Sequence, residues 1–167
     1  MAALPLAEWR DFYVMIGTAA GVIVGATFIV ATLATGEARG IGLKGFITPI
    51  AVHLGSVLVG SAILAVPTLT SLVFAALLGI GGIAGMIYGA IVAGRIWHMN
   101  LDLSDRSFYV ILPILSYAGM TGAAWMVREP QMPALETLAV SLVLLLVVGM
   151  RNAWDMATFM VTRNRSS

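Results

Sequence analysis

The stretch from Gly45 to Gly94, GFITPIAVHLGSVLVGSAILAVPTLTSLVFAALLGIGGIAGMIYGAIVAG, decides the fold because it contains no Asp, Glu, Lys or Arg. A membrane-spanning α-helix needs about 20 consecutive apolar residues, so this run is long enough for two spans. Pro67, followed by Thr68 and Thr70, provides the turn between them, since proline interrupts a helix. The run therefore predicts a helical hairpin in a lipid bilayer.

Three further segments extend this pattern along the chain. Residues 12–36 and 107–127 carry no charged side chain, and another apolar segment runs from Ala134 to about Val161. The whole chain is 60% hydrophobic and only 10% charged, whereas soluble domains are about a quarter charged. We therefore expect an all-α integral membrane protein, forming one transmembrane domain over residues 1–167. Its five transmembrane helices are predicted at about 9–35, 45–66, 71–97, 105–127 and 134–161.

The basic residues are distributed unevenly between the two predicted sides of the membrane. One side carries Arg39, Lys44, Arg95, Arg106, Arg163 and Arg165, and the other only Arg10 and Arg128. The excess of Lys and Arg in cytoplasmic segments predicts a cytoplasmic C-terminus and an N-terminus outside. The Ala-, Gly- and Val-rich composition suggests a bacterial inner (plasma) membrane. A net charge of +1 argues against a nucleic-acid partner.

The chain resembles itself at an offset of 64 residues. IGTAAGVIVGA (Ile16–Ala26) aligns without gaps on IGGIAGMIYGA (Ile80–Ala90), with seven of eleven positions identical. At the same offset, ITPIAVHLG (Ile47–Gly55) aligns on ILPILSYAG (Ile111–Gly119). Two matching blocks at one offset predict two tandem two-helix repeats, over about 9–66 and 73–127, with the fifth helix added.

Glycines recur every four residues on the first and third predicted helices. That spacing places them on one helix face, where a second backbone can approach closely. The pattern predicts helix-packing seams of the glycine-zipper kind, either within the chain or between subunits of a homo-oligomer. Pro113 lies about two turns into the fourth helix and is expected to bend it. The seam residues are Gly17, Gly21 and Gly25 on the first helix, and Gly81, Gly85 and Gly89 on the third.

Polar residues inside the apolar spans form the candidate functional site, because ionisable groups at membrane depth are costly. Arg151 and Asp155 are spaced i, i+4, so they share one helix face. Counting the helical rise from the cytoplasmic ends brings His53 to a similar depth. Asn152 and Tyr109 would complete a polar cluster suited to a proton relay or an ion-coordinating lining.

The same charges have a second interpretation. Residues 134–150 alone approach the length of a short span, and Arg151 with Trp154 would then be interfacial anchors. The apolar residues that follow, including Met156 and Phe159, favour burial instead.

The histidines are weaker indicators of a cofactor. A buried histidine such as His53 is usually hydrogen-bonded within the protein rather than a ligand, and His98 falls in an interfacial Arg-Ile-Trp-His sequence. A bis-histidine haem would require both rings at one depth, and they are separated by roughly 10 Å along the membrane normal. We therefore expect neither a cofactor nor a metal. The sequence also lacks a phosphate-binding loop and the motifs of hydrolases, so it does not predict an enzyme.

Two classes of function remain. The first is a small, oligomeric channel or transporter for an ion or small polar solute. The second is a non-transporting accessory or regulatory subunit that binds a larger membrane-protein complex. A membrane redox or lipid-modifying enzyme is the least supported alternative.

Overall fold

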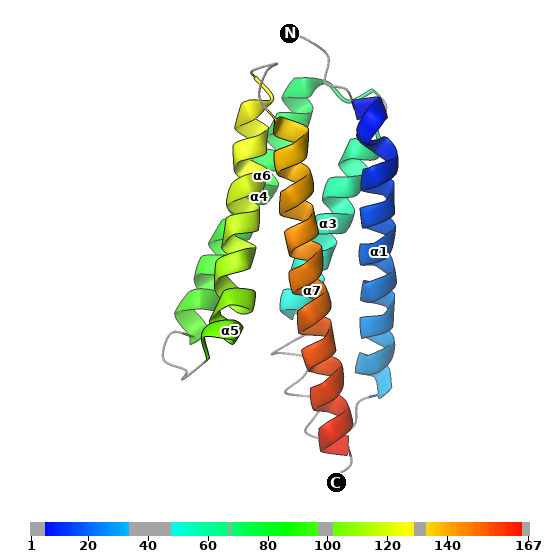
Figure 1. Cartoon of the computed structure of the whole chain (residues 1–167), viewed down its shortest axis with the longest axis vertical. Coiled ribbons are helices and arrows are strands. Elements are labelled where there is room, and N and C mark those ends of the chain that lie inside the picture. The colour runs from blue at the N-terminus through cyan, green and yellow to red at the C-terminus, as the bar shows by residue number, and fades with distance from the viewer. Residues whose placement is uncertain (1–5, 34–47, 67, 97–101, 129–132, 165–167) are drawn as a thin grey trace.

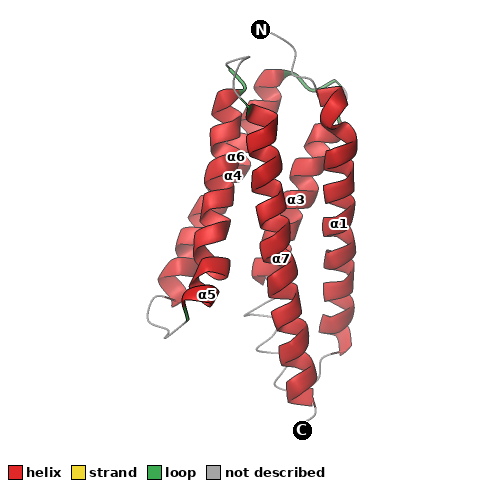
Figure 2. Cartoon of the chain, in the orientation of Figure 1, coloured by secondary structure: helices red, strands yellow, loops and turns green. Residues whose placement is uncertain are grey.

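The computed structural model describes residues 6–33, 48–66, 68–96, 102–128 and 133–164. Helices make up nearly all of these residues, with short connections at the ends of the bundle (Figure 2). Their bounds are α1 Leu6–Leu33, α3 Thr48–Ala65, α4 Ser71–Ile96, α5 Leu103–Arg106, the π-helical turn η2 Ser107–Ile111, α6 Leu112–Met126 and α7 Ala134–Asn164.

The five predicted helices are all present, the fourth being the continuous series α5, η2 and α6. Four of them are long and apolar enough to cross a membrane: Glu8–Thr32, Ser71–Ile96, Leu103–Met126 and Ala134–Phe159. The apolar part of α3, Pro49–Ala65, is shorter and reaches about 26 Å at 1.5 Å per residue, slightly less than the hydrocarbon thickness. The chain is thus a multi-span helical membrane protein. The predicted end of the first helix at 35, start of the second at 45 and end of the third at 97 lie outside the described residues.

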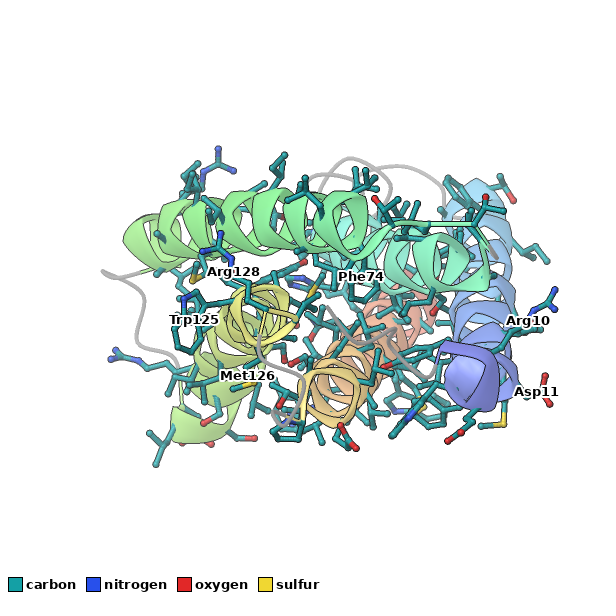
Figure 3. All side chains as sticks on the ribbon, turned by 90° about the horizontal axis from the view of Figure 1, so that it is seen from above. Arg10, Asp11, Phe74, Trp125, Met126 and Arg128 are labelled. Atoms are coloured by element: carbon teal, nitrogen blue, oxygen red, sulfur yellow. The ribbon has the colours of Figure 1, made fainter. Side chains whose placement is uncertain are left out.

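The helices form two antiparallel hairpins with α7 between them. Helix α1 packs against α3, α4 packs against α6, and α7 contacts α1, α3 and α6. Seen from above, α3 and α4 lie in one layer and α6, α7 and α1 in the other (Figure 3). The beginning of α1 and the end of α7 lie at opposite ends of the bundle (Figure 1).

Helix α7 carries a buried stripe with alternating three- and four-residue spacing, the heptad pattern of helices packed by knobs into holes. Its members are Leu135, Leu138, Leu142, Leu145, Gly149, Asn152 and Met156, all of them buried. The stripe runs the length of the bundle and faces both hairpins. One member, Asn152, is polar.

Close helix contacts depend on small residues. A Cβ atom on Gly149 would overlap the Leu54 side chain of α3, and one on Gly119 would overlap the Ser141 side chain of α7. The hydroxyl of Tyr13 donates a hydrogen bond of 2.7 Å to the carbonyl oxygen of Leu135 and joins α1 to the start of α7. These contacts connect α7 to α1, α3 and α6.

The predicted glycine seams face neighbours within the chain for part of their length. A Cβ on Gly17 would lie 2.8 Å from Ser61 Cβ of α3, and one on Gly89 would lie 2.7 Å from Ile114 Cγ1 of α6. The ring of Tyr117 occupies the space beside Gly85.

The rest of each seam is more open. A Cβ on Gly21 would make an ordinary contact with Leu58, and Gly25 and Gly81 have no such neighbour within 4 Å. Each seam therefore has a packed part and an open end.

Gly85 and Gly81, one turn apart on α4, allow this packing to be tested. We expect Gly85→Ala to lower the free energy of unfolding by about 1–3 kcal/mol, because its methyl group would overlap the Tyr117 ring. Gly81→Ala should leave it unchanged or raise it slightly, since alanine is the better helix former. Thermal unfolding in detergent measures both, and equal midpoints for the two variants would contradict the packing of α4 on α6.

Candidate functional site

The charged part of the site, here called the Arg151 cluster, consists of Arg151, Asp155, Tyr109, Asp105, Ser104 and Phe108. Arg151 Nε lies 3.7 Å from Asp155 Oδ2 on the same helix, and Arg151 Nη2 lies 3.6 Å from Asp105 Oδ1 on α5. The Tyr109 hydroxyl donates to Asp155 Oδ2 over 3.5 Å. Each of the three charged side chains is about a third or more exposed.

Two further groups hold the guanidinium in place. Arg151 Nη1 donates to Ser104 Oγ at 3.2 Å, and its central carbon lies 4.4 Å from the centre of the Phe108 ring, within the range of a cation–π contact. One cation thus lies between two carboxylates, a hydroxyl and an aromatic face, and it ties α7 to the start of the fourth predicted span.

A π-helical turn explains why consecutive residues of one helix both reach this cluster. Proline at 113 has no N–H to bond to the carbonyl of Tyr109, and its ring would clash with that carbonyl in a regular α-helix. The chain widens into the turn Ser107–Ile111 immediately before α6, as π-bulges often do near functional sites. Phe108 then lies beneath Arg151 while Tyr109 reaches Asp155.

A second polar group lies inside the bundle and is called here the His53 network. His53, 2% exposed, has its Nδ1 atom 3.0 Å from the Tyr117 hydroxyl. That hydroxyl also lies 3.1 Å from Ser56 Oγ, and Ser56 donates to the carbonyl oxygen of Val52. The Tyr88 ring packs edge-on against the imidazole at 6.0 Å. This network connects α3 of one hairpin with α4 and α6 of the other.

Asn152 is the third element and differs from both groups. Its side chain is 0% exposed, and neither amide atom has a hydrogen-bond partner among the residues that the structure describes. Leu54, the neighbour of His53, contacts Gly149, so His53 lies within about one helical turn of Asn152 along α7. An amide with no partner among the described residues is thus enclosed on the inner face of α7, at the depth of the Arg151 cluster and about one turn from the level of His53.

The structure brings together three of the predicted site residues, Arg151, Asp155 and Tyr109. His53 instead bonds to Tyr117 in the His53 network. Among the described residues, Asn152 forms no hydrogen bond to either group. His98 lies outside the described residues, and the described part of the chain contains no group of three His, Cys, Asp or Glu side chains that could hold a metal.

Several residues of the site were not predicted. Asp105, Ser104 and Phe108 are far from Arg151 in the sequence, and no local pattern relates them. Tyr117 did carry a signal, because it aligns with His53 at the 64-residue offset. Comparison with known proteins adds no assignment: no protein-family model, curated protein or solved structure matches the chain.

The two carboxylates beside Arg151 allow a prediction about stability. Asp155→Asn or Asp105→Asn alone should lower the free energy of unfolding by less than about 1 kcal/mol, because the groups are partly exposed and a second carboxylate remains. The double variant should cost more than the two single changes combined. Thermal unfolding of the four proteins in one detergent measures this, and strictly additive shifts would contradict a shared cation.

The hydroxyl of Tyr117 provides a second prediction. Tyr117→Phe keeps the ring but removes the partner of His53 and Ser56, so we expect a loss of about 1–3 kcal/mol in the free energy of unfolding. Tyr88→Phe is the matched control, because its ring contacts the same imidazole and its hydroxyl has no recorded bond among the described residues. Chemical unfolding measures both variants, and losses of the same size would argue against the network.

Proposed function

We propose that the chain is a small membrane channel or transporter for an ion or a small polar solute. The observation that carries the proposal is Asn152, whose amide is fully buried and has no hydrogen-bond partner within the described part of the chain. An amide without a hydrogen bond in an apolar environment costs several kcal/mol at most and about 1–3 kcal/mol in typical proteins. A transient partner, namely water or the transported species, would offset that cost.

The arrangement of the polar groups supports a path from one end of the bundle toward its middle. The partly exposed Arg151 cluster forms the mouth, at the membrane boundary next to α5. Asn152 lies at the same depth on the inner, buried face of α7, and the His53 network lies deeper along the neighbouring helices. Rings and rows of such side chains replace the hydration shell of an ion or solute in membrane pathways.

In this conformation the proposed path is blocked by buried side chains, so transport requires a conformational change. Leu145 and Leu142, which follow Gly149 in the α7 stripe, are 0% exposed and block the path beyond Asn152. Opening therefore requires α7 to move against the hairpins. The Arg151 cluster is well placed to control that motion because it joins α7 to α5.

We further propose that the two hairpins are tandem repeats related by a pseudo-twofold axis beside α7. His53 and Tyr117 correspond at the 64-residue offset, and they bond to each other. Equivalent residues that touch lie next to the axis relating two repeats, so we place a pseudo-twofold axis at this pair. The two hairpins are not identical in packing. Tyr117 packs beside Gly85, but at the equivalent Gly21 the neighbour is Leu58 and not His53.

For orientation we retain a cytoplasmic C-terminus in a bacterial inner membrane, from the distribution of basic residues. The mouth of the path then faces the cytoplasm. The open glycines Gly25 and Gly81 support self-association of copies, because small residues at a lipid-facing surface allow helices to approach closely.

The second candidate function is that of an accessory subunit in a membrane complex. A groove of about 370 Å³ between α3 and α4, lined by Gly55, Gly60 and Gly81 among other residues, favours it. A transmembrane helix of another protein would fit such a surface. In that case the isolated chain would transport nothing.

The test is flux through vesicles containing the purified chain, measured for K⁺, Na⁺, H⁺ and Cl⁻. We expect a selective flux that Asn152→Leu reduces by at least about tenfold, because leucine fits the apolar stripe but offers no polar group to a solute, and tenfold corresponds to about 1.4 kcal/mol. Arg151→Gln should alter selectivity. Thr158→Val, on an exposed part of α7 one to two turns away, should leave the flux unchanged.

The stability of the same variants separates transport from folding. Asn152→Leu should be at least as stable as the original chain, because it removes an unpaired buried amide. A stable Asn152→Leu protein with undiminished flux would contradict the path. A folded original chain without flux for any ion would favour the accessory function.

A further inference from the structure

A second groove, of about 600 Å³, lies between α4 and α6 at the end of the bundle opposite the Arg151 cluster. Its floor is formed by small residues spaced four apart on α4, Ser71, Ala75 and Gly79. Because these side chains are short, the surface of α4 is hollowed along this line. Leu72 and Trp125 border it, and they are 74% and 60% exposed.

The mouth of this groove carries a cation. Arg128 lines it, directly after the last turn of α6, where its backbone N–H bonds to the carbonyl oxygen of Trp125. Figure 3 shows Trp125 and Arg128 on the side of α6 away from α7. Within the described residues, no carboxylate lies in ion-pair distance of Arg128.

The groove extends from the headgroup level of a bilayer into its hydrocarbon layer. Helix α4 begins at Ser71 and α6 ends at Met126, so both helices meet the membrane boundary at this level. Tryptophan is typical of that boundary, and an arginine beside it lies at the depth of lipid headgroups. The floor extends from Ser71 toward Gly79, about 12 Å into the hydrocarbon.

We propose that this groove binds one phospholipid, with its phosphate at Arg128 and one acyl chain on the floor formed by Ser71, Ala75 and Gly79. A phospholipid has an anion at headgroup depth and an apolar chain directly below it, which is the order of the groups in the groove. Guanidinium binds phosphate through two parallel hydrogen bonds. The volume is in the range of ligand-binding clefts, and the lining is mostly apolar.

The charge at the mouth distinguishes this occupant from a protein helix. A transmembrane helix seated on the floor would bring apolar side chains to Arg128, or cover it with no partner for its charge. The groove between α3 and α4, in contrast, has no charged residue in its lining. The lipid proposal does not depend on the transport function.

The test uses the full chain in vesicles of phosphatidylethanolamine and phosphatidylglycerol containing a trace of photoactivatable phosphatidylglycerol. A photoactivatable diacylglycerol with the same chains but no phosphate is used in parallel. We expect labelling by the phospholipid within residues 71–79 and 124–128, and little by the diacylglycerol. Arg128→Gln should reduce labelling about five- to tenfold, since one arginine near a membrane surface contributes about that factor.

Two pairs of variants provide controls. Arg10→Gln removes an exposed cation at the same end of the bundle but on α1, on the opposite side of the molecule (Figure 3), and should leave labelling unchanged. Ala76→Phe narrows the groove and should reduce labelling. Val22→Phe places the same ring on an exposed site of α1 and should not.

Three results would overturn the proposal. These are equal labelling of Arg128→Gln and Arg10→Gln, equal labelling by diacylglycerol and phospholipid, and crosslinks from the groove to a second copy or another polypeptide in place of lipid. The thermal midpoint of each variant is measured beforehand, and because Arg128 is exposed, Arg128→Gln is expected to fold. Loss of labelling in a protein that melts normally is therefore a binding effect.

Discussion

The buried heptad stripe of α7 is the constraint on which the rest of this structure depends. In a bilayer, helices gain little from hydrophobic burial, because lipid chains are as apolar as the side chains they replace. Association then requires close packing and a few interhelical hydrogen bonds. The stripe meets this requirement through the contact of Gly149 with Leu54 of α3. Beside the stripe, Ser141 packs against Gly119 of α6, so that α7 contacts both hairpins.

The same packing determines where polar groups can be accommodated. The Arg151 cluster lies where α7 passes the start of α5, so its charges share partners and retain some exposure. The His53 network lies where side chains of the two hairpins meet across the bundle, and three polar atoms satisfy one another there. Asn152 belongs to the stripe itself, and its amide has no hydrogen-bond partner in the described helices, which is why it carries the functional proposal.

The packing of α4 leaves two separate grooves on the outer surface of the bundle. Close contacts through Gly85 and Gly89 hold α4 against α6 in the middle of the membrane, while α3 and α4 scarcely touch. Grooves therefore remain on both sides of α4, one without a charged residue in its lining and one ending at Arg128. A single helix thus presents two different surfaces to its surroundings, and only one of them has the charge expected of a headgroup site.

The class of protein follows from the amino-acid sequence, because uncharged runs such as Gly45–Gly94 have the length and composition of membrane helices. The sequence also indicated the pairing of Arg151 with Asp155, since an i, i+4 spacing places two side chains together whatever surrounds the helix. The length of α3 within the bundle and the π-turn before Pro113 were less predictable, because helix ends and local strain depend on neighbouring packing.

The tertiary structure alone decided which polar residues meet. His53 was expected beside Arg151 and Asp155 from its depth, yet its hydrogen-bond partner is Tyr117, whose hydroxyl also contacts Ser56. Depth follows from the helical rise along one segment, whereas the direction of a side chain around its helix matters only once the neighbouring helices are in place. For the same reason the burial of Asn152 and the grooves beside α4 emerged from the packing of helices that are distant in the sequence.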